Sequence, residues 1–323
     1  MRGPTGSHAL VIGALVDSGL IGSCLGGPCL RTSRDENLST ALSRANPTDI
    51  KGAEMNMTDA EQSRSKAESS WSPIVELRQY TLHPGQRDNL VDLFEREFIE
   101  PQEELGMRVL GQFDDLDDPN RFVWLRGFED MHTRAQGLAA FYGGPVWKQH
   151  RDVANATMVD SDNVLLLRPA RPGSGFSPDS TERPPRHSHM SRRGCVAAGI
   201  YAMDAQLEGA FVDFVEERLR PVLSDVGAAL LAYFATESSP NTFPTLPVRD
   251  GEFVFVWLAG FPVGAAPEAV TPGGGALGGL MPNAPTQMQP IQVLRLAPTA
   301  RSALTGSSPP CPAISLSGSE HGA

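Results

Sequence analysis

A seven-residue pattern occurs twice in this chain and constrains its fold more than any other feature. Residues 122–128 read Phe-Val-Trp-Leu-Arg-Gly-Phe, and residues 255–261 read Phe-Val-Trp-Leu-Ala-Gly-Phe. A short run of apolar and aromatic residues that ends at a glycine is typical of a buried strand. Because an internal repeat indicates a repeated structural unit, the two copies predict that the chain contains two related modules.

The sequence around the first copy predicts a β-α-β-β-α-β module over residues 74–169. Residues 75–82 alternate and are rich in β-branched and aromatic residues, as in a strand. Helical periodicity begins near residue 86, and Pro101 is expected to kink this helix or to end its regular part. Later strands are expected at 107–113, 121–128 and 163–168, and a second helical region, capped by Asp130 and resumed at Pro145, precedes the last one. This order is the ferredoxin-like arrangement, in which helices cover one face of a four-stranded antiparallel sheet.

Residues 195–298 are expected to repeat this module in a degenerate form. Pro221 follows Tyr201 at nearly the separation at which Pro101 follows Tyr80. After the second Val-Trp-Leu pattern the copies diverge, because glycine and proline stand where the first copy predicts a helix, and a last strand is expected at 291–296. The open apolar face of each sheet needs cover, so we expect the two sheets to pack together as an α+β barrel that encloses a cavity.

The remaining segments are expected to lie outside the folded modules. Residues 1–73 are predicted to be a disordered leader, residues 170–194 a Pro/Ser/Arg-rich linker, and residues 299–323 a disordered tail. The longest apolar run of the leader is too short to span a bilayer, and a poor signal peptide is the alternative interpretation. His187 and His189 in the linker form a weak metal-binding pattern.

Charge and motif content exclude several classes of function. The net charge of -11 argues against a nucleic-acid partner, because contact with phosphates needs a basic face. The four cysteines include no Cys-x-x-Cys pair, so we expect neither a zinc site nor a disulfide framework, and we predict a cytoplasmic location. The sequence shows no phosphate loop, nucleophile elbow or dinucleotide fingerprint in a supporting context. We therefore expect no metal, no cofactor and no membrane span, and we leave a homo-oligomer open.

Two tracts of the first module resemble the NIPSNAP family. They are Tyr-Thr-Leu-x-Pro-Gly at residues 80–85 and a long tract at residues 141–167 that contains Gly-Pro-Val-Trp-Lys-x-His-Arg and Asp-Ser-Asp-Asn-Val-Leu-Leu-Leu. The resemblance is clearest over residues 74–169 and weaker over residues 195–298. That family belongs to the dimeric α+β barrel superfamily, so the resemblance implies the fold that the periodicity predicts. It implies no established catalysis, although related barrels include cofactor-independent monooxygenases, isomerases and haem enzymes.

The candidate site residues all lie in the first module. Trp147, His150 and Arg151 are three and four residues apart, so one helix face can present them to an anion or a polar small molecule. Arg78 and Tyr80 share one face of the first strand, which points either into the barrel or under a helix. The candidate ligand-binding residues are Arg78, Tyr80, Trp124, Trp147, His150 and Arg151.

These candidates leave several functions open. The leading hypothesis is a small-molecule-binding or protein-interaction barrel without established catalysis. The alternative is a cofactor-independent monooxygenase or isomerase that acts on a hydrophobic or aromatic molecule, which requires Tyr80, His150 and Arg151 to converge. Haem binding through His150 is a third possibility. In the simplest structural interpretation, Trp147 is core, Arg151 pairs with a nearby aspartate, and the acidic residues at 160–163 form a turn.

Overall fold

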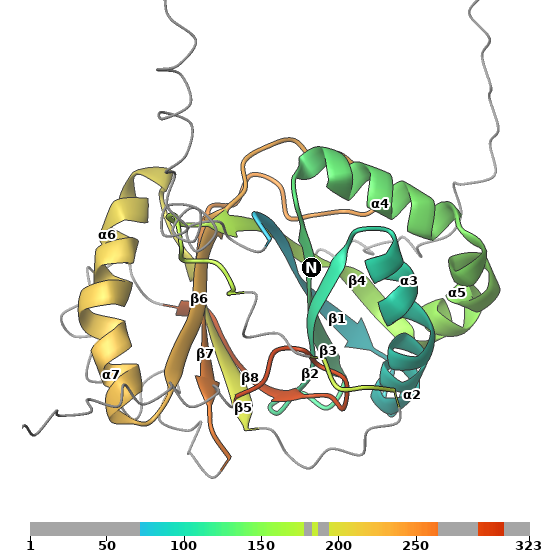
Figure 1. Ribbon diagram of the computed structural model, residues 1–323, viewed down its shortest axis with the longest axis horizontal. Coiled ribbons are helices and arrows are strands. Elements are labelled where there is room, and N and C mark those ends of the chain that lie inside the picture. Colours follow the sequence, from blue (N-terminus) through green and yellow to red (C-terminus); the bar gives the residue numbers. More distant parts are fainter. Residues whose placement is uncertain (1–71, 178–182, 187–193, 264–289, 307–323) are drawn as a thin grey trace, which may run out of the picture. The chain divides into compact units, whose positions relative to one another are not determined.

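Eight antiparallel strands form a closed barrel (Figure 1). The computed structural model of the protein describes residues 72–177, 183–186, 194–263 and 290–306. The strand order around the barrel is β1-β3-β2-β8-β5-β7-β6-β4. The first module supplies β1 (Ile74–Leu82), β2 (Arg108–Asp115), β3 (Arg121–Phe128) and β4 (Met158–Pro169), and the second supplies β5 (Cys195–Ala202), β6 (Ala229–Thr236), β7 (Val254–Phe261) and β8 (Pro290–Pro298).

The two modules have the same internal strand order, and their edges meet to close the barrel. Within each module the first strand lies between the third and the fourth, and the second strand lies outside the third. The module edges pair through β2 with β8 and through β4 with β6. This confirms the predicted α+β barrel. The hydrogen bonds between module edges remove open strand edges, which would otherwise be free to pair with another chain.

Helices cover the outer face of each sheet. The first module carries α2 (Arg87–Leu93), α3 (Ile99–Glu104), α4 (Met131–Gly143) and α5 (Pro145–Thr157), and the second carries α6 (Glu208–Phe214) and α7 (Arg220–Asp225), which lie against β6 and β7 (Figure 1). A π-helical turn joins α2 to α3 at Phe94–Phe98, and another joins α6 to α7 at Val215–Leu219. Pro101 and Pro221 follow these turns. Because proline cannot donate to the carbonyl four residues earlier, a widened turn interrupts the regular α-helix before each proline.

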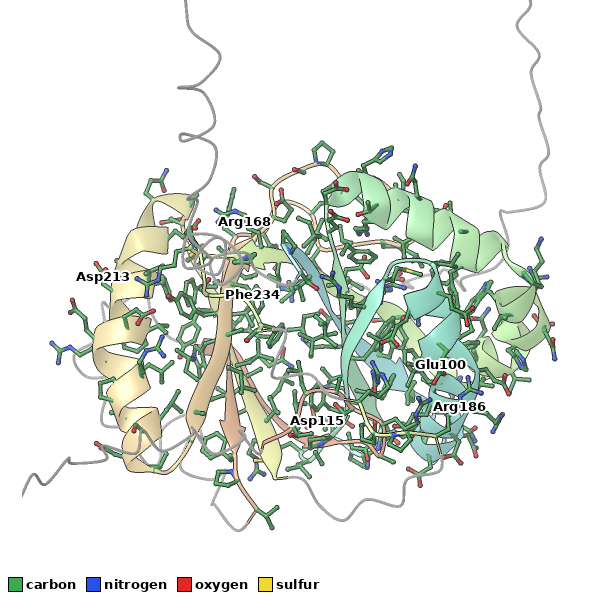
Figure 2. All side chains as sticks on the ribbon, viewed as in Figure 1. Glu100, Asp115, Arg168, Arg186, Asp213 and Phe234 are labelled. Atoms are coloured by element: carbon green, nitrogen blue, oxygen red, sulfur yellow. The ribbon has the colours of Figure 1, made fainter. Side chains whose placement is uncertain are left out.

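The interior of the barrel is an apolar core that both modules build. Val75 and Leu77 of β1 meet Val196 of β5 and Phe234 of β6 there, and each is completely buried. Phe234 is labelled in Figure 2. The prediction of a cavity at the barrel centre is therefore wrong, because branched and aromatic side chains from both sheets fill that space. A small cavity lies instead between the first sheet and its helices.

Parts of the predicted linker and of the predicted disordered tail pack against the barrel. Phe176, from the predicted linker, is 2% exposed, and its ring centre lies 5.2 Å from that of Phe234. Leu304, from the predicted tail, is 1% exposed, and its N–H donates to the carbonyl of Leu110. Each segment covers apolar core that the strands leave open. Residues 1–71, 178–182, 187–193, 264–289 and 307–323, which include most of the predicted leader and the His187 and His189 pair, lie outside the described residues.

Candidate ligand-binding site

Four charged side chains are completely buried on the helix-facing side of the first sheet. They are Glu76 and Arg78 of β1, Arg126 of β3 and Arg134 of α4, and we call them the charge cluster. Residues two apart on a strand share a face, and Arg126 lies directly opposite Glu76 in the pairing of β1 with β3. The strand register therefore brings three members together, and α4 supplies the fourth.

The start of α4 fixes the position of Arg134. Asp130 caps this helix, as the sequence predicts, because its carboxylate accepts a hydrogen bond from the Thr133 N–H at 2.7 Å and its own N–H donates to the Thr133 hydroxyl at 3.0 Å. This reciprocal pair is a capping box, which sets the helix start. Arg134 follows directly, and its guanidinium reaches the sheet.

Three guanidinium groups share the single carboxylate of the cluster. Glu76 Oε2 accepts from Arg78 Nη1 at 3.0 Å and from Arg126 Nη2 at 2.7 Å, while Oε1 accepts from Arg134 Nε at 2.8 Å. Within the described residues the salt bridges of these arginines all run to Glu76. The cluster thus holds two positive charges in excess. Burial of a charge is costly unless an opposite charge or hydrogen bonds compensate it, so this excess is an unusual feature of a protein interior.

The arginines keep Glu76 ionised. Burial alone would raise the pKa of Glu76, but the charges of Arg126, Arg78 and Arg134 outweigh burial and hold the pKa far below its usual value. Burial would also lower the pKa of Arg78, yet Tyr80 and Glu76 raise it above the ordinary arginine value. Glu76 and Arg78 therefore both carry their charges at neutral pH.

We predict that Glu76 makes the fold sensitive to acid. A carboxyl whose pKa is depressed in the fold contributes its full stability above its unfolded pKa, near 4.5, and this contribution is lost as the pH falls towards the lower folded pKa. The free energy of unfolding, measured by urea denaturation, should therefore fall below pH 4.5 more steeply in the wild type than in Glu76→Gln. In a carbon-13 NMR titration the Glu76 carboxyl should remain ionised where ordinary glutamates protonate. Protonation of Glu76 at an ordinary glutamate pKa would contradict this prediction.

A small aromatic cavity adjoins the charge cluster between the first sheet and its helices. Seven of its eleven lining residues are aromatic, and its volume of about 20 Å³ is enough for about one water molecule. Tyr80 and Gln102 line the cavity and also contact the charge cluster. The Tyr80 hydroxyl accepts from Arg78 Nε at 3.1 Å, and the side-chain oxygen of Gln102 accepts from Arg126 Nη1 at 2.9 Å. The cavity thus has mostly apolar walls, and at one end Tyr80 and Gln102 separate it from the buried guanidinium groups.

Two buried N–H groups at this end have no hydrogen-bond partner in the described part of the chain. They are Arg78 Nη2 and Trp124 Nε1. The guanidinium carbon of Arg78 lies 5.5 Å from the centre of the Trp124 ring and 5.5 Å from that of Tyr80. Buried polar groups are nearly always paired, so each unpaired one calls for an explanation. Because both groups are donors, the chemistry that matches them is an acceptor, and the excess charge favours an anionic one.

Comparison with known proteins places these features in a family. The NIPSNAP family model matches residues 75–172, which contain the whole charge cluster. The crystal structure of an uncharacterized NIPSNAP-like domain protein from Burkholderia xenovorans is 33% identical over an alignment that covers 30% of this chain and 84% of that one, with a TM-score of 0.28. The chain belongs to the NIPSNAP family.

Other structures agree with this assignment or add little to it. A NIPSNAP family protein of unknown function from Agrobacterium tumefaciens is 25% identical, and the alignment covers 32% of this chain and 91% of that one, with a TM-score of 0.29. A candidate monooxygenase from Lactobacillus acidophilus covers 72% of this chain and 97% of its own, but at 11% identity and a TM-score of 0.43 it carries no argument about chemistry. A search of curated proteins finds no match.

The second module of this NIPSNAP protein lacks the charges of the first. Ala197, Gly199 and Ala259 occupy the strand positions that correspond to Glu76, Arg78 and Arg126. A Cβ atom at Gly199 would lie 2.4 Å from the Trp257 ring, so the indole fills the space that Arg78 takes in the first module. Trp257 Nε1 donates to the Tyr201 hydroxyl at 3.2 Å. In the first module Arg78 uses the matching tyrosine hydroxyl, which leaves Trp124 Nε1 unpaired.

The predicted site residues separate into two groups. Tyr80, Trp124 and Trp147 line the cavity, and Arg78 contacts the first two of them. The face of β1 that carries Arg78 and Tyr80 therefore points under the helices and not into the barrel. The lining does not include His150 or Arg151.

Helix geometry explains why His150 and Arg151 are absent from the cavity lining, although the His150 ring packs edge-on against Phe98 with ring centres 6.2 Å apart. At 100° per residue they lie on either side of Trp147, and only Trp147, Ala154 and Thr157 of α5 are buried. His150 Nε2 lies 3.7 Å from Glu97 Oε2, and Arg151 Nε lies 3.5 Å from an oxygen of Asp152. Tyr80 therefore does not converge with His150 and Arg151 in the cavity lining, as the enzymatic alternative requires. Arg151 instead pairs with a nearby aspartate, Asp152, as the simplest structural interpretation predicts.

The acidic tract at residues 160–163 forms part of β4 and not the predicted turn. Its pairing with β1 is irregular between Gln79 and Thr81. The Asp160 side chain makes a local hydrogen bond there, because its carboxylate accepts from the N–H of Asp162 at 2.9 Å. Among the residues that the structure describes, no group of three His, Cys, Asp or Glu side chains is arranged to hold a metal ion. The described helices include none that is long and apolar enough to cross a membrane.

Sequence reasoning missed Glu76, Arg126, Arg134 and Gln102. One signal was present. Arg126 interrupts an otherwise apolar strand, and the other copy of the same strand has Ala259 there. A charged residue at a position that must be buried indicates a partner of opposite charge or a function.

Proposed function

We propose that this NIPSNAP protein binds a small organic anion with an aromatic or other apolar body, and that it does not catalyse a reaction on it. The observation that carries the proposal is the charge cluster, in which two buried positive charges are in excess beside an aromatic cavity. The anionic group would bind Arg78 Nη2 and Trp124 Nε1, and the apolar body would lie among the aromatic side chains.

The expected energetics support this assignment. A hydrogen bond to a charged group contributes about 1.5–3 kcal/mol, and a carboxylate matches the planar geometry of a guanidinium. Each square ångström of apolar surface removed from water adds roughly 25 cal/mol. A ligand that combines both groups would therefore gain from each end of the cavity, whereas a neutral polar molecule would leave the charge excess uncompensated.

The composition of the cavity favours binding over acid–base catalysis. The residues that line it include no His, Cys, Asp, Glu or Lys. Burial raises the pKa of the Tyr80 phenol, against the opposing charge of Arg78, so that Tyr80 stays neutral and cannot serve as a base at neutral pH. These features give the monooxygenase or isomerase alternative no specific support.

The proposal extends to the second module. We regard it as a degenerate copy of the first that serves as a built-in partner, since its strands complete the barrel within one chain. A homo-oligomer would then add contacts outside the barrel and would not be needed to close it. We also propose a cytoplasmic location, on the cysteine usage of the chain.

A panel of matched acids and amides tests the proposed function. Benzoate, phenylacetate and indole-3-acetate are each titrated beside the corresponding neutral amide. Because Trp124 and Trp147 line the cavity and the chain has four tryptophans, binding should change the intrinsic fluorescence. At least one acid should bind about 10–100-fold more tightly than its amide. Equal affinities for each acid and its amide would contradict the proposal, and so would the absence of any change in fluorescence and thermal midpoint with all pairs. Chemical conversion of a bound acid would contradict its non-catalytic part.

A further inference from the structure

The connection between β6 and β7 reaches from the second module onto the site of the first. Asn241 Oδ1 and Thr242 Oγ1 accept hydrogen bonds from Arg134 Nη1 at 3.0 and 3.2 Å, and the Thr242 hydroxyl donates to the carbonyl of Met131 at 3.0 Å. We call residues 240–247 the loop tip. The loop tip thus contacts a member of the charge cluster directly.

The loop tip also backs the wall of the cavity. The Phe243 ring stacks on Tyr142, with ring centres 6.2 Å apart and an angle of 23° between the planes. Tyr142 lines the cavity, and its ring centre lies 4.9 Å from that of Trp147. Leu246 is completely buried in the apolar layer between the first sheet and its helices. Tyr142 is therefore held between the cavity on one side and a ring from the second module on the other.

The cavity must enlarge before it can accept a ligand with a ring. Its volume is about 20 Å³, whereas an apolar cavity that holds benzene has a volume of about 150 Å³. The sheet wall consists of buried strand residues. The wall where the π-helical turn meets α4 and α5 is held by Phe98, whose ring packs on Phe141 and Trp147. The remaining wall, at Tyr142, is held by contacts from a loop, so its movement needs the least free energy.

The construction of the loop permits this movement. Its two ends are anchored on β4, where Glu237 N–H donates to Leu166 and Arg249 N–H donates to Val164. Between them lies a hollow of about 180 Å³ whose lining includes Ser239, so the ends are not packed against each other. Prolines at 240, 244 and 247 restrict the backbone of the loop tip, which favours movement as a unit.

We infer that the loop tip is the movable wall of the binding site and that Phe243 sets the size of the ligand that the site accepts. This inference rests on the proposed function. The second module then does more than close the barrel, because it supplies a residue that determines specificity in the first. Removal of the Phe243 ring would let Tyr142 swing outward and would make room for a larger apolar body.

The experiment compares wild type with Phe243→Ala and the matched control Phe253→Ala. Phe253 belongs to the same connection, is 44% exposed and does not line the aromatic cavity. Benzoate and 2-naphthoate are titrated against each protein. Phe243→Ala should shift the ratio of the two dissociation constants towards 2-naphthoate by about tenfold or more, while Phe253→Ala should keep the wild-type ratio. Equal ratios in all three proteins would overturn the inference.

A second measurement separates this inference from the proposed function. If the wild type binds none of the acids, the proposed function fails, but access to the cavity is still measurable by acrylamide quenching of tryptophan fluorescence. Phe243→Ala should then raise the quenching constant above the values of wild type and Phe253→Ala. No difference between the two variants would overturn the assignment of the loop tip as the movable wall.

Discussion

Replacement of Glu76 by glutamine is expected to lower the free energy of unfolding by about 3–5 kcal/mol. Glutamine keeps the size of the side chain but removes the one negative charge that three completely buried guanidinium groups share. The cluster would then hold three uncompensated charges away from water. Urea denaturation at pH 7, followed by circular dichroism, measures the loss.

Two further variants show where that loss arises. Glu97→Gln is the matched control, because Glu97 is partly exposed and its ion pairs are with the exposed Arg96 and, at 3.7 Å, with His150. We therefore expect a change of about 0–1 kcal/mol. The double variant Glu76→Gln, Arg126→Met should be more stable than Glu76→Gln alone, because the second substitution removes one of the three buried charges that the first leaves uncompensated. A loss in Glu76→Gln no larger than in Glu97→Gln would contradict the described role of the carboxylate.

The fold was predictable because its signals are local. Alternation and β-branched residues locate β1, and the repeated Val-Trp-Leu pattern locates β3 and β7 to within one or two residues at each end. The direction in which each strand face points was not predictable in the same way. Leu77 and Arg78 are both completely buried, one in the barrel and one under the helices. When both faces of a strand are covered, the pattern alone does not distinguish inside from outside.

The site was only partly predictable because most of its contacts join distant parts of the chain. Arg78 and Tyr80 could be chosen from one strand, but Arg134 contacts Glu76 across 58 residues and Asn241 across 107. Trp147 is buried, as the simplest structural interpretation of this helix predicts, because an aromatic residue on an amphipathic helix belongs to its buried side. The sequence placed His150 and Arg151 on the same helix face as Trp147, but the buried stripe of α5 is narrower than that face and does not include them.

Replacement of Arg78 by methionine is expected to weaken the binding of an aromatic carboxylate about 10–150-fold. Methionine fills a similar volume but removes the guanidinium that holds one of the two unpaired donors. Glu76 would retain Arg126 and Arg134 as partners, so the fold should survive. Fluorescence titration with the tightest acid of the panel and its amide measures the effect, and the affinity for the amide should change little because the amide lacks the charge.

Arg151→Met provides the matched control and decides between two positions for the anion. The helix-face hypothesis from the sequence places the anion at Arg151, whereas the structure gives Arg151 a partly exposed position beside Asp152. We expect Arg151→Met to bind the acid as the wild type does. Weaker binding in Arg151→Met and unchanged binding in Arg78→Met would place the ligand on the outer face of α5. The second module favours weaker binding in Arg78→Met. There Gly199 stands in place of the arginine, and the N–H of Trp257 already donates to Tyr201, so no free donor is left for an anion.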